Sequence, residues 1–255
     1  MDDLRFGGSP IRRAVASASG SVAFGVDVVG DLQAGVENFV GEVRGAVAIG
    51  CVGWLTDEKV VDTLLRLDAC CIVVNKPDRD EAAQQRLLRE GAGLPASALP
   101  ALAGLQPRRS DGGPQILGPF GAIEEIELEP VRVAGYRAND RARPLLHAKM
   151  LILGTLTWEP HPSGMVVGEV PVFRPRRCWM GSANWTRNAR RSLEVGWWTE
   201  DPEVLAASTA FLADVLALSE PHGSSAARPE PELLPVEFDD DAMVEALDDE
   251  PHDDE

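Results

Sequence analysis

The amino-acid sequence predicts an α/β sandwich, in which a mixed, largely parallel sheet is flanked by helices. Two apolar runs, AVAIGCVGWL (46–55) and ACCIVVNK (69–76), are typical of buried strands. The segment between them, 56–67, has the apolar spacing of a helix. A strand, a helix and a second strand within roughly 30 residues form a right-handed crossover, which makes the two strands parallel. At 255 residues the chain can bury one good-sized core, so we expect one main domain, residues 1–219.

The first half of the chain contains further predicted elements. A short strand is expected within SVAFGVDVV (21–29), and apolar residues at helical spacing predict an amphipathic helix within 32–46. Thr56 is a plausible N-cap of the helix in 56–67. Pro77 begins an irregular insertion, 78–125, in which we expect one helix, within 79–92, closed by Gly91.

The second half of the chain returns to strands. We expect strands within 129–137, 143–154 and 192–201, and a hairpin excursion that returns to a strand near RRCWMGS (176–182). The stretch 202–220 predicts a strong amphipathic helix with Pro202 in its first turn. Its predicted core side carries Val204, Leu205, Phe211, Leu212, Val215 and Leu216.

Residues 220–255 form an acidic segment that we expect to be a disordered tail. Its only basic side chain, apart from histidines, is Arg228, and it contains five prolines and few large apolar residues. Such a composition buries too little surface to offset the entropy lost on ordering. An alternative is that a short helix within the tail docks on a protein partner.

Charge is distributed unevenly along the chain. The net charge is −17, but between Val131 and Arg191 eleven lysines and arginines face only Asp140, Glu159 and Glu169. This half of the protein suits an anionic substrate.

The cysteines and the hydropathy pattern limit the class of protein. Cys51, Cys70, Cys71 and Cys178 lack metal-site spacing, which predicts buried free thiols in a reducing cytoplasm. No apolar run approaches the roughly 20 residues that span a bilayer. We therefore expect a cytoplasmic protein with no membrane partner.

The segment LLHAKMLIL (145–153) places two polar residues within an apolar run. In a strand, His147 and Lys149 would emerge on the same face because side chains alternate. Burying a cation beside an imidazole without an anion is costly, so a bound phosphate would supply the missing charge. In isolation, His147 would be interpreted as a satisfied core histidine.

A second polar segment follows at GSANWT (181–186). Ser182 and Asn184 again have the spacing of one strand face, and Gly181 allows close approach of the backbone to a ligand. Glu194 is the one carboxylate in the apolar run SLEVG and could orient an imidazole, although it could also pair with Arg190 or Arg191. A simple turn is the alternative for Ser182 and Asn184.

Together, HAK, GSANWT and SLEVG resemble the motifs of the phospholipase D superfamily, whose pattern is HxKxxxxD, then GSxN, then an acidic residue. The strand–helix–strand segment 46–76 also looks like the opening of that fold. Two departures stand out: Gly154 occupies the position of the family's Asp, and the spacing from there to Gly181 is longer than usual. In that family the Asp is chiefly a structural support, and one branch works with His, Lys and Asn alone.

The resemblance implies a phosphodiesterase that needs no metal ion and no other cofactor. His147 would be the nucleophile, Lys149, Asn184 and Ser182 would stabilise the transition state, and Glu194 would fix the tautomer of His147. The superfamily needs two HxK motifs and this chain has one, so a homodimer is expected.

The basic half favours a nuclease acting on DNA or RNA, with Arg176, Arg177 and Arg187 as candidate substrate-binding residues. Two alternatives remain. One is a phospholipid-directed phosphodiesterase, which would want a membrane-docking surface. The other is a catalytically silent nucleic-acid-binding or scaffold subunit of an intracellular complex.

Overall fold

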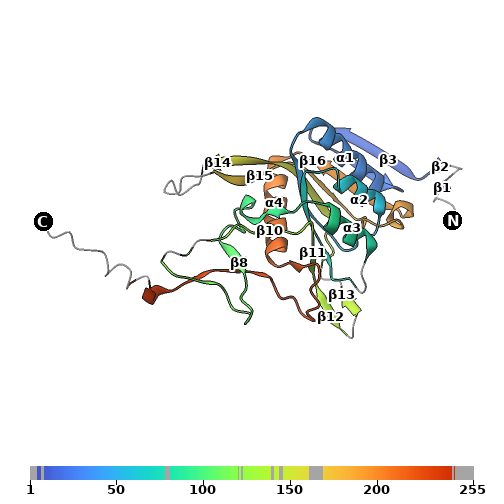
Figure 1. Ribbon diagram of the computed structural model, residues 1–255. Helices are drawn as coiled ribbons and strands as arrows, with labels where there is room; N and C mark the ends of the chain where they lie inside the picture. Colours follow the sequence, from blue (N-terminus) through green and yellow to red (C-terminus); the bar gives the residue numbers. More distant parts are fainter. Residues whose placement is uncertain are drawn as a thin grey trace.

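A nine-stranded sheet forms the centre of the protein in the computed structural model (Figure 1). The structure describes residues 5–6, 9–77, 81–119, 121, 123–138, 141–143, 146–160, 169–242 and 244. In their order across the sheet, the strands are β17 (Glu220–Pro221), β11 (Val131–Ala134), β6 (Ala69–Asn75), β5 (Ala46–Val52), β14 (Met150–Pro160), β15 (Glu169–Gly181), β16 (Glu194–Thr199), β4 (Gly20–Gly25) and β3 (Arg12–Ser17).

The sheet is mixed, as predicted, but it is mostly antiparallel. The predicted crossover is confirmed, because β5 pairs with β6 in parallel through α2 (Glu58–Leu64). Strand β11 extends this parallel group. Every other pairing in the sheet is antiparallel, so the expectation of a largely parallel sheet does not hold. The consecutive strands β3–β4, β14–β15 and β15–β16 pair antiparallel, an arrangement that needs no helical crossover.

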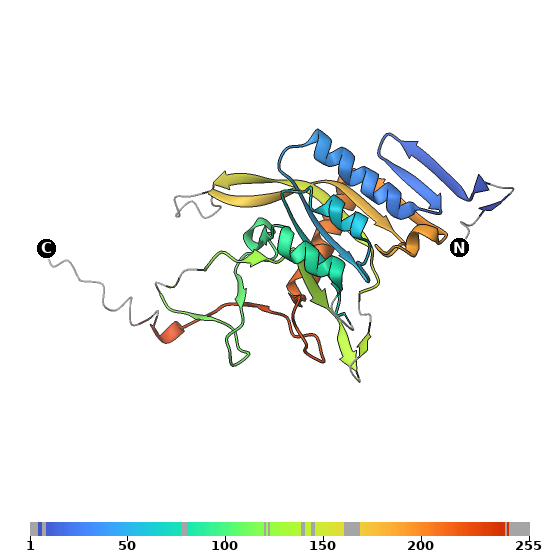
Figure 2. The same cartoon turned by 45° about the vertical axis from the view of Figure 1, so that its right-hand side comes forward.

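Helices cover both faces of the sheet, which confirms the sandwich. Helices α1 (Val28–Glu42), α2 and α3 (Ala82–Glu90) lie on one face, and α4 (Pro202–Ala217) lies on the other (Figures 1 and 2). The all-buried strands β5 and β6 separate the two apolar cores. Asp57, rather than Thr56, caps α2, because its carboxylate accepts hydrogen bonds from the backbone N–H groups of Lys59 and Val60.

Only part of the predicted apolar side of α4 faces the core. Leu205, Leu212 and Leu216 are buried, whereas Phe211 is 42% exposed. Phe211 lies one residue before buried Leu212, and the helical rotation of about 100° per residue turns Phe211 toward solvent.

Residues 78–125 are more regular than predicted. Besides α3, the insertion contains η1 (Ala96–Ala98) and three strands that pair with distant segments. These pairs are β7 (Leu94–Pro95) with β10 (Glu127–Leu128), β8 (Leu105–Pro107) with β18 (Leu233–Pro235), and β9 (Ile116–Leu117) with β19 (Glu237–Phe238). Another small pair, β1 (Arg5–Phe6) with β2 (Ser9–Pro10), lies near the N-terminus.

The acidic segment after residue 219 packs on the domain over much of its length, in contrast to the expected disorder. The buried ammonium of Lys76 lies 2.6 Å from the carboxylate of Glu220 and also donates to the carbonyl oxygens of Ala226 and Arg228. Buried Arg132 makes a similar contact with Glu232, at 2.6 Å. Acidic side chains here neutralise buried cations of the core, which a reading of composition alone does not detect.

All four cysteines are buried and free, as predicted. Burial raises the pKa of the Cys51 and Cys71 thiols to about 12 and that of Cys178 to about 11. In the part of the chain that the structure describes, no helix is long and apolar enough to cross a membrane.

Candidate functional site

The predicted motifs meet at one edge of the sheet. Strands β5 and β6 are parallel, so their carboxyl ends share an edge. Strand β14 runs antiparallel to β5 and therefore begins at that edge, β15 ends there, and β16 begins there. The segment HAK precedes β14, GSAN follows β15 and Glu194 opens β16. This topology brings HxK, GSxN and the acidic residue together.

The long spacing between the first two motifs is a single hairpin. Strands β14 and β15 pair from Met150↔Met180 to Pro160↔Glu169, and both views show their far end extending beyond the helices (Figures 1 and 2). Adding residues at the far end of a hairpin leaves the pairing at its base unchanged. The stretched spacing therefore does not separate Lys149 from Gly181, whose N–H donates to the Lys149 carbonyl oxygen at 3.1 Å.

Gly154 marks a close backbone contact inside this hairpin. The register shifts between Leu153 and Gly154, and a Cβ at Gly154 would lie 2.3 Å from the carbonyl oxygen of Arg174. No side chain fits there without moving the neighbouring strand. The absence of the family's Asp at this position thus has a local structural cause.

His147 and Lys149 lie just before β14 and differ sharply in exposure. The imidazole of His147 is exposed, whereas Lys149 is only 5% exposed. The ammonium of Lys149 donates to the carbonyl oxygen of His147 at 2.7 Å. Desolvation lowers the pKa of Lys149, and the nearby charge of Glu194 acts in the opposite direction. The expected buried cation is present, and the imidazole of His147 is open to solvent.

Ser182 and Asn184 lie in the loop that follows β15. The Ser182 hydroxyl accepts a hydrogen bond from the N–H of Val195 at 3.0 Å, and the Ser182 N–H donates to the Val195 carbonyl at 2.9 Å. The Oδ1 atom of Asn184 is buried and has no hydrogen-bond partner among the described residues. A buried polar atom without a partner is uncommon in a folded protein.

The loop that carries Ser182 and Asn184 is held by backbone hydrogen bonds to the loop after β5. The backbone N–H of Trp185 donates to the carbonyl oxygen of Trp54 at 3.1 Å. The backbone carbonyl oxygen of Trp185 accepts hydrogen bonds from the N–H groups of Thr56 and Asp57 at 3.0 and 3.1 Å. These bonds tie GSAN to the loop after β5, so the motif is more than an isolated turn.

Glu194 accepts a hydrogen bond from the hydroxyl of Ser182. Within the described ranges it forms no ion pair with an arginine and no hydrogen bond with His147. Arg190 instead pairs with Asp57 at 2.5 Å and with Asp27 at 3.0 Å, which holds the start of α1 near α2. Glu194 therefore orients Ser182 directly, and its effect on Lys149 is electrostatic.

Asn75 is a site residue that the sequence analysis missed. Its side-chain amide donates to the carbonyl of Leu146 and accepts from the N–H of Leu146, both at 3.0 Å. A Cβ on Gly53 would lie 3.1 Å from Asn184 Oδ1 and 3.2 Å from Asn75 Nδ2, so glycine leaves room for both amides. The signal in the sequence was a polar residue at the carboxyl end of an otherwise apolar strand.

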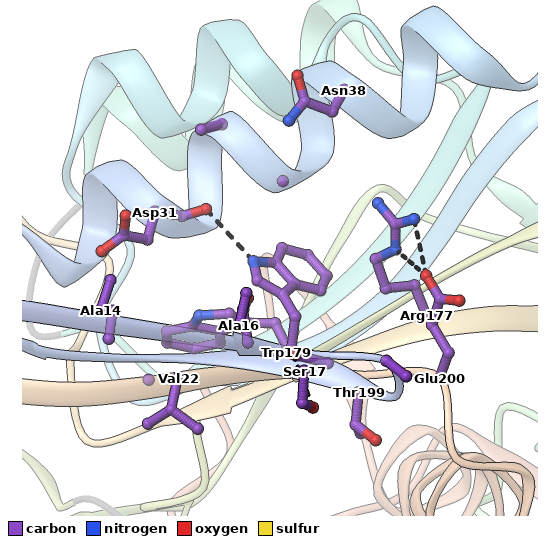
Figure 3. A pocket seen from close by; sticks show the side chains of 18 residues that line it. Ala14, Ala16, Ser17, Val22, Asp31, Asn38, Arg177, Trp179, Thr199 and Glu200 are labelled. Carbon is purple, nitrogen blue, oxygen red and sulfur yellow. Dashed lines mark hydrogen bonds and ion pairs between the residues drawn. The ribbon is translucent and has the colours of Figure 1, made fainter.

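The three arginines expected to bind substrate are not grouped. Arg176 and Arg177 lie on β15, five and four residues from Gly181, or about 13–17 Å along the strand. Arg177 pairs with Glu200 at 2.7 Å beside a cavity of about 370 Å³ between α1 and the strands β3, β4 and β16 (Figure 3). Arg187 is exposed and lies three residues after Asn184.

Comparison with known proteins gives similarities in structure only. No family model matches the chain, and no curated protein matches it. NucT from Helicobacter pylori has a TM-score of 0.45 and 12% identity, over 78% of this chain and 98% of that chain. Nuc from Salmonella typhimurium, a phospholipase D family member, has a TM-score of 0.42 and 13% identity, over 79% of this chain and 97% of that chain. The chain is similar in fold to a phospholipase D family member.

Among the described residues, no group of three or more His, Cys, Asp or Glu side chains is arranged to hold a metal ion. The polar groups at the site are an imidazole, an ammonium, two amides, a hydroxyl and one carboxylate. Such a set can form a covalent bond through the imidazole and bind an anion through the ammonium and amides.

Proposed function

We propose that this protein is a metal-independent phosphodiesterase of the phospholipase D superfamily, and that it cleaves nucleic acid through a phosphohistidine formed on His147. The observation that carries the proposal is the placement of exposed His147 next to buried Lys149, at the same sheet edge as Asn184.

Lys149 supports an anionic substrate. Burial disfavours its charged form, and no described carboxylate forms an ion pair with it. A phosphodiester bound beside His147 would supply the compensating negative charge, and the amide N–H groups of Asn184 would add donors to the phosphoryl oxygens.

The reaction then has two displacement steps. An imidazole nitrogen of His147 attacks phosphorus, the P–N bond forms, and the P–O bond to the leaving group breaks as that oxygen receives a proton from the partner's His147. Water, deprotonated by the partner's His147, then attacks phosphorus and breaks the P–N bond. Lys149 and Asn184 of both subunits stabilise the negative charge in each transition state, and Glu194 holds the Ser182 hydroxyl in place.

The homodimer can be tested by mixing subunits. If each active centre uses His147 from both subunits, an equal mixture of wild type and His147→Ala after subunit exchange retains about a quarter of the wild-type activity, because only the wild-type homodimer is complete. Independent monomers would retain half. An active enzyme that shows the second result would contradict the shared active centre.

The covalent step can be tested by trapping. A substrate labelled at the scissile phosphorus, quenched in alkali during turnover, should leave label on the wild-type protein that is released by acid, and none on His147→Ala. Asn188→Ala is a matched control, since Asn188 is an exposed residue of the same loop that follows GSAN. Cleavage without label on the protein would contradict the phosphohistidine. Salt-sensitive binding of nucleic acid without cleavage would favour a silent binding subunit instead.

A further inference from the structure

A two-stranded ribbon projects from the sheet as a separate arm (Figures 1 and 2). It consists of β12 (Tyr136–Ala138) and β13 (Arg141–Arg143), which pair antiparallel. Gly135 separates it from β11 with a φ of +118°, a backbone conformation that L side chains rarely adopt. The turn at Gly135 thus directs the chain out of the sheet.

One face of the ribbon carries an aromatic ring and two cations. Tyr136 lies directly opposite Arg143, and Ala138 lies opposite Arg141. Because side chains alternate along a strand, Tyr136, Arg141 and Arg143 share one face. All three are exposed, Tyr136 by 44%, and neither arginine has an ion pair with a described residue. Tyr136 is the single tyrosine of the chain.

The intervening position anchors the ribbon. Arg137 donates from its guanidinium to the carbonyl of Pro77 at 2.6 Å, and its backbone N–H donates to the carbonyl of Ala227 at 2.9 Å. The ribbon is therefore tied to the loop after β6 and to the C-terminal segment. These contacts leave Tyr136 and the two arginines presented outward by a fixed base.

Both ends of the ribbon lie beside the candidate site. Strand β11, which leads into it, ends with Ala134 paired to Asn75. Asn75 is also the residue that binds Leu146, three residues after the ribbon ends at Arg143. Three residues of extended chain span at most about 10 Å. A strand of nucleic acid with its phosphate at His147 would thus pass close to this ribbon.

We propose that the β12–β13 ribbon binds single-stranded nucleic acid next to the scissile phosphate, with a base stacked on Tyr136 and phosphates contacted by Arg141 and Arg143. The inference rests on the proposed function for the identity of the ligand. An aromatic ring beside guanidinium groups that have no ion pair with a described residue is a combination suited to binding single strands without reading sequence. The two arginines are about 7 Å apart along β13, which allows contacts to neighbouring phosphates.

The test measures binding rather than turnover, so that it does not depend on cleavage. Fluorescence anisotropy of a labelled oligothymidylate is titrated with the full chain carrying His147→Ala, in EDTA and at several salt concentrations. The added variants are Tyr136→Ala, Tyr136→Phe and the double variant Arg141→Gln with Arg143→Gln. The matched control is Arg44→Gln with Arg89→Gln, two exposed arginines without described ion pairs.

The control arginines lie at the opposite end of the sheet. Arg44 precedes the amino end of β5, and Arg89 is in the last turn of α3, close to Ala92, whose carbonyl accepts from the N–H of Cys70 near the start of β6. The control removes the same total charge as the ribbon variant, so it measures the effect of net charge alone.

We expect Tyr136→Ala to weaken binding roughly fivefold to a hundredfold and Tyr136→Phe to retain it, because a base stacks on either ring. The double arginine variant should lower the slope of log affinity against log salt by about 1.4, the value for two single-strand phosphate contacts. The inference would be overturned if Tyr136→Ala or the double arginine variant bound like the control, or if duplex DNA bound more tightly than the single strand. If the wild-type protein cleaves no substrate in the trapping experiment, the proposed function is overturned, but the binding result still stands.

Discussion

The side-chain amide of Asn75 makes two hydrogen bonds of 3.0 Å with the backbone of Leu146, the residue before His147. This pair of bonds imitates a strand pairing at a point where β5 has already ended at Val52. Asn75 thus connects β6 to the segment that carries the proposed nucleophile. A change at Asn75 should move His147 without removing any group that contacts substrate.

Asn75→Ala is expected to lower kcat about 10- to 100-fold with a smaller change in KM, because displacement of a reacting group by about 1 Å has an effect of this size. Asn75→Asp keeps the acceptor for the Leu146 N–H and loses the donor, so we expect an intermediate kcat. Steady-state kinetics at a fixed temperature well below unfolding checks this. Equal losses in both variants, or an effect on KM alone, would argue against a positioning role.

Lys149→Met is expected to abolish turnover and to stabilise the free protein by about 1 kcal/mol, a typical gain when a functional site loses an unfavourable group. The physical reason is that wild-type folding desolvates the Lys149 ammonium without a partner carboxylate. Thermal unfolding should show a Tm higher by about 2–4 °C for a chain of this size. A destabilised variant would show that the ammonium is compensated in the free protein.

The stability difference between Lys149→Met and wild type should depend on pH. Folding lowers the pKa of Lys149, so the native state binds this proton less tightly than the unfolded state. The resulting cost to the wild type is complete below the lowered pKa and disappears as pH rises toward the unfolded value of about 10.4. Unfolding measured at neutral and at alkaline pH should therefore give a smaller advantage of the variant at high pH.

The Lys76–Glu220 pair predicts a strong dependence of stability on the start of the C-terminal segment. Lys76→Met should destabilise the protein by about 3–5 kcal/mol, because it leaves the carboxylate of Glu220 buried and unpaired. The double variant Lys76→Met with Glu220→Gln should recover part of this loss. Urea unfolding of the four proteins in this cycle measures the coupling, and additive effects would show that the pair is not coupled.

Much of the site was predictable because it depends on local motifs and short connections. HAK, GSANWT and Glu194 could be recognised as motifs from the sequence, although HAK was expected within a strand and lies just before β14. The crossover 46–76 was also predictable and is confirmed. Asn75 could not be recognised, since its partner Leu146 is 71 residues away along the chain. Arg176 and Arg177 lie farther from the motif than their closeness in sequence suggests, because extended β15 separates them from Gly181.

The fold was predicted less well where long-range pairing decides it. Composition predicted disorder after residue 219, yet Glu220 and Glu232 are partners of the buried cations Lys76 and Arg132. Such pairings depend on three-dimensional proximity rather than on hydropathy. The same holds for the mostly antiparallel sheet, in which β14 pairs with β5 and β16 pairs with β4, strands that lie far apart in the chain.

The central claim is that His147 carries out metal-independent phosphodiester cleavage. The most direct measurement compares cleavage of labelled single-stranded DNA, duplex DNA and RNA by wild type and His147→Ala in excess EDTA. The account predicts EDTA-resistant cleavage of at least one of these by the wild type and its loss, by about three orders of magnitude or more, in His147→Ala. Cleavage that persists in His147→Ala, or that EDTA abolishes in the wild type, would contradict it.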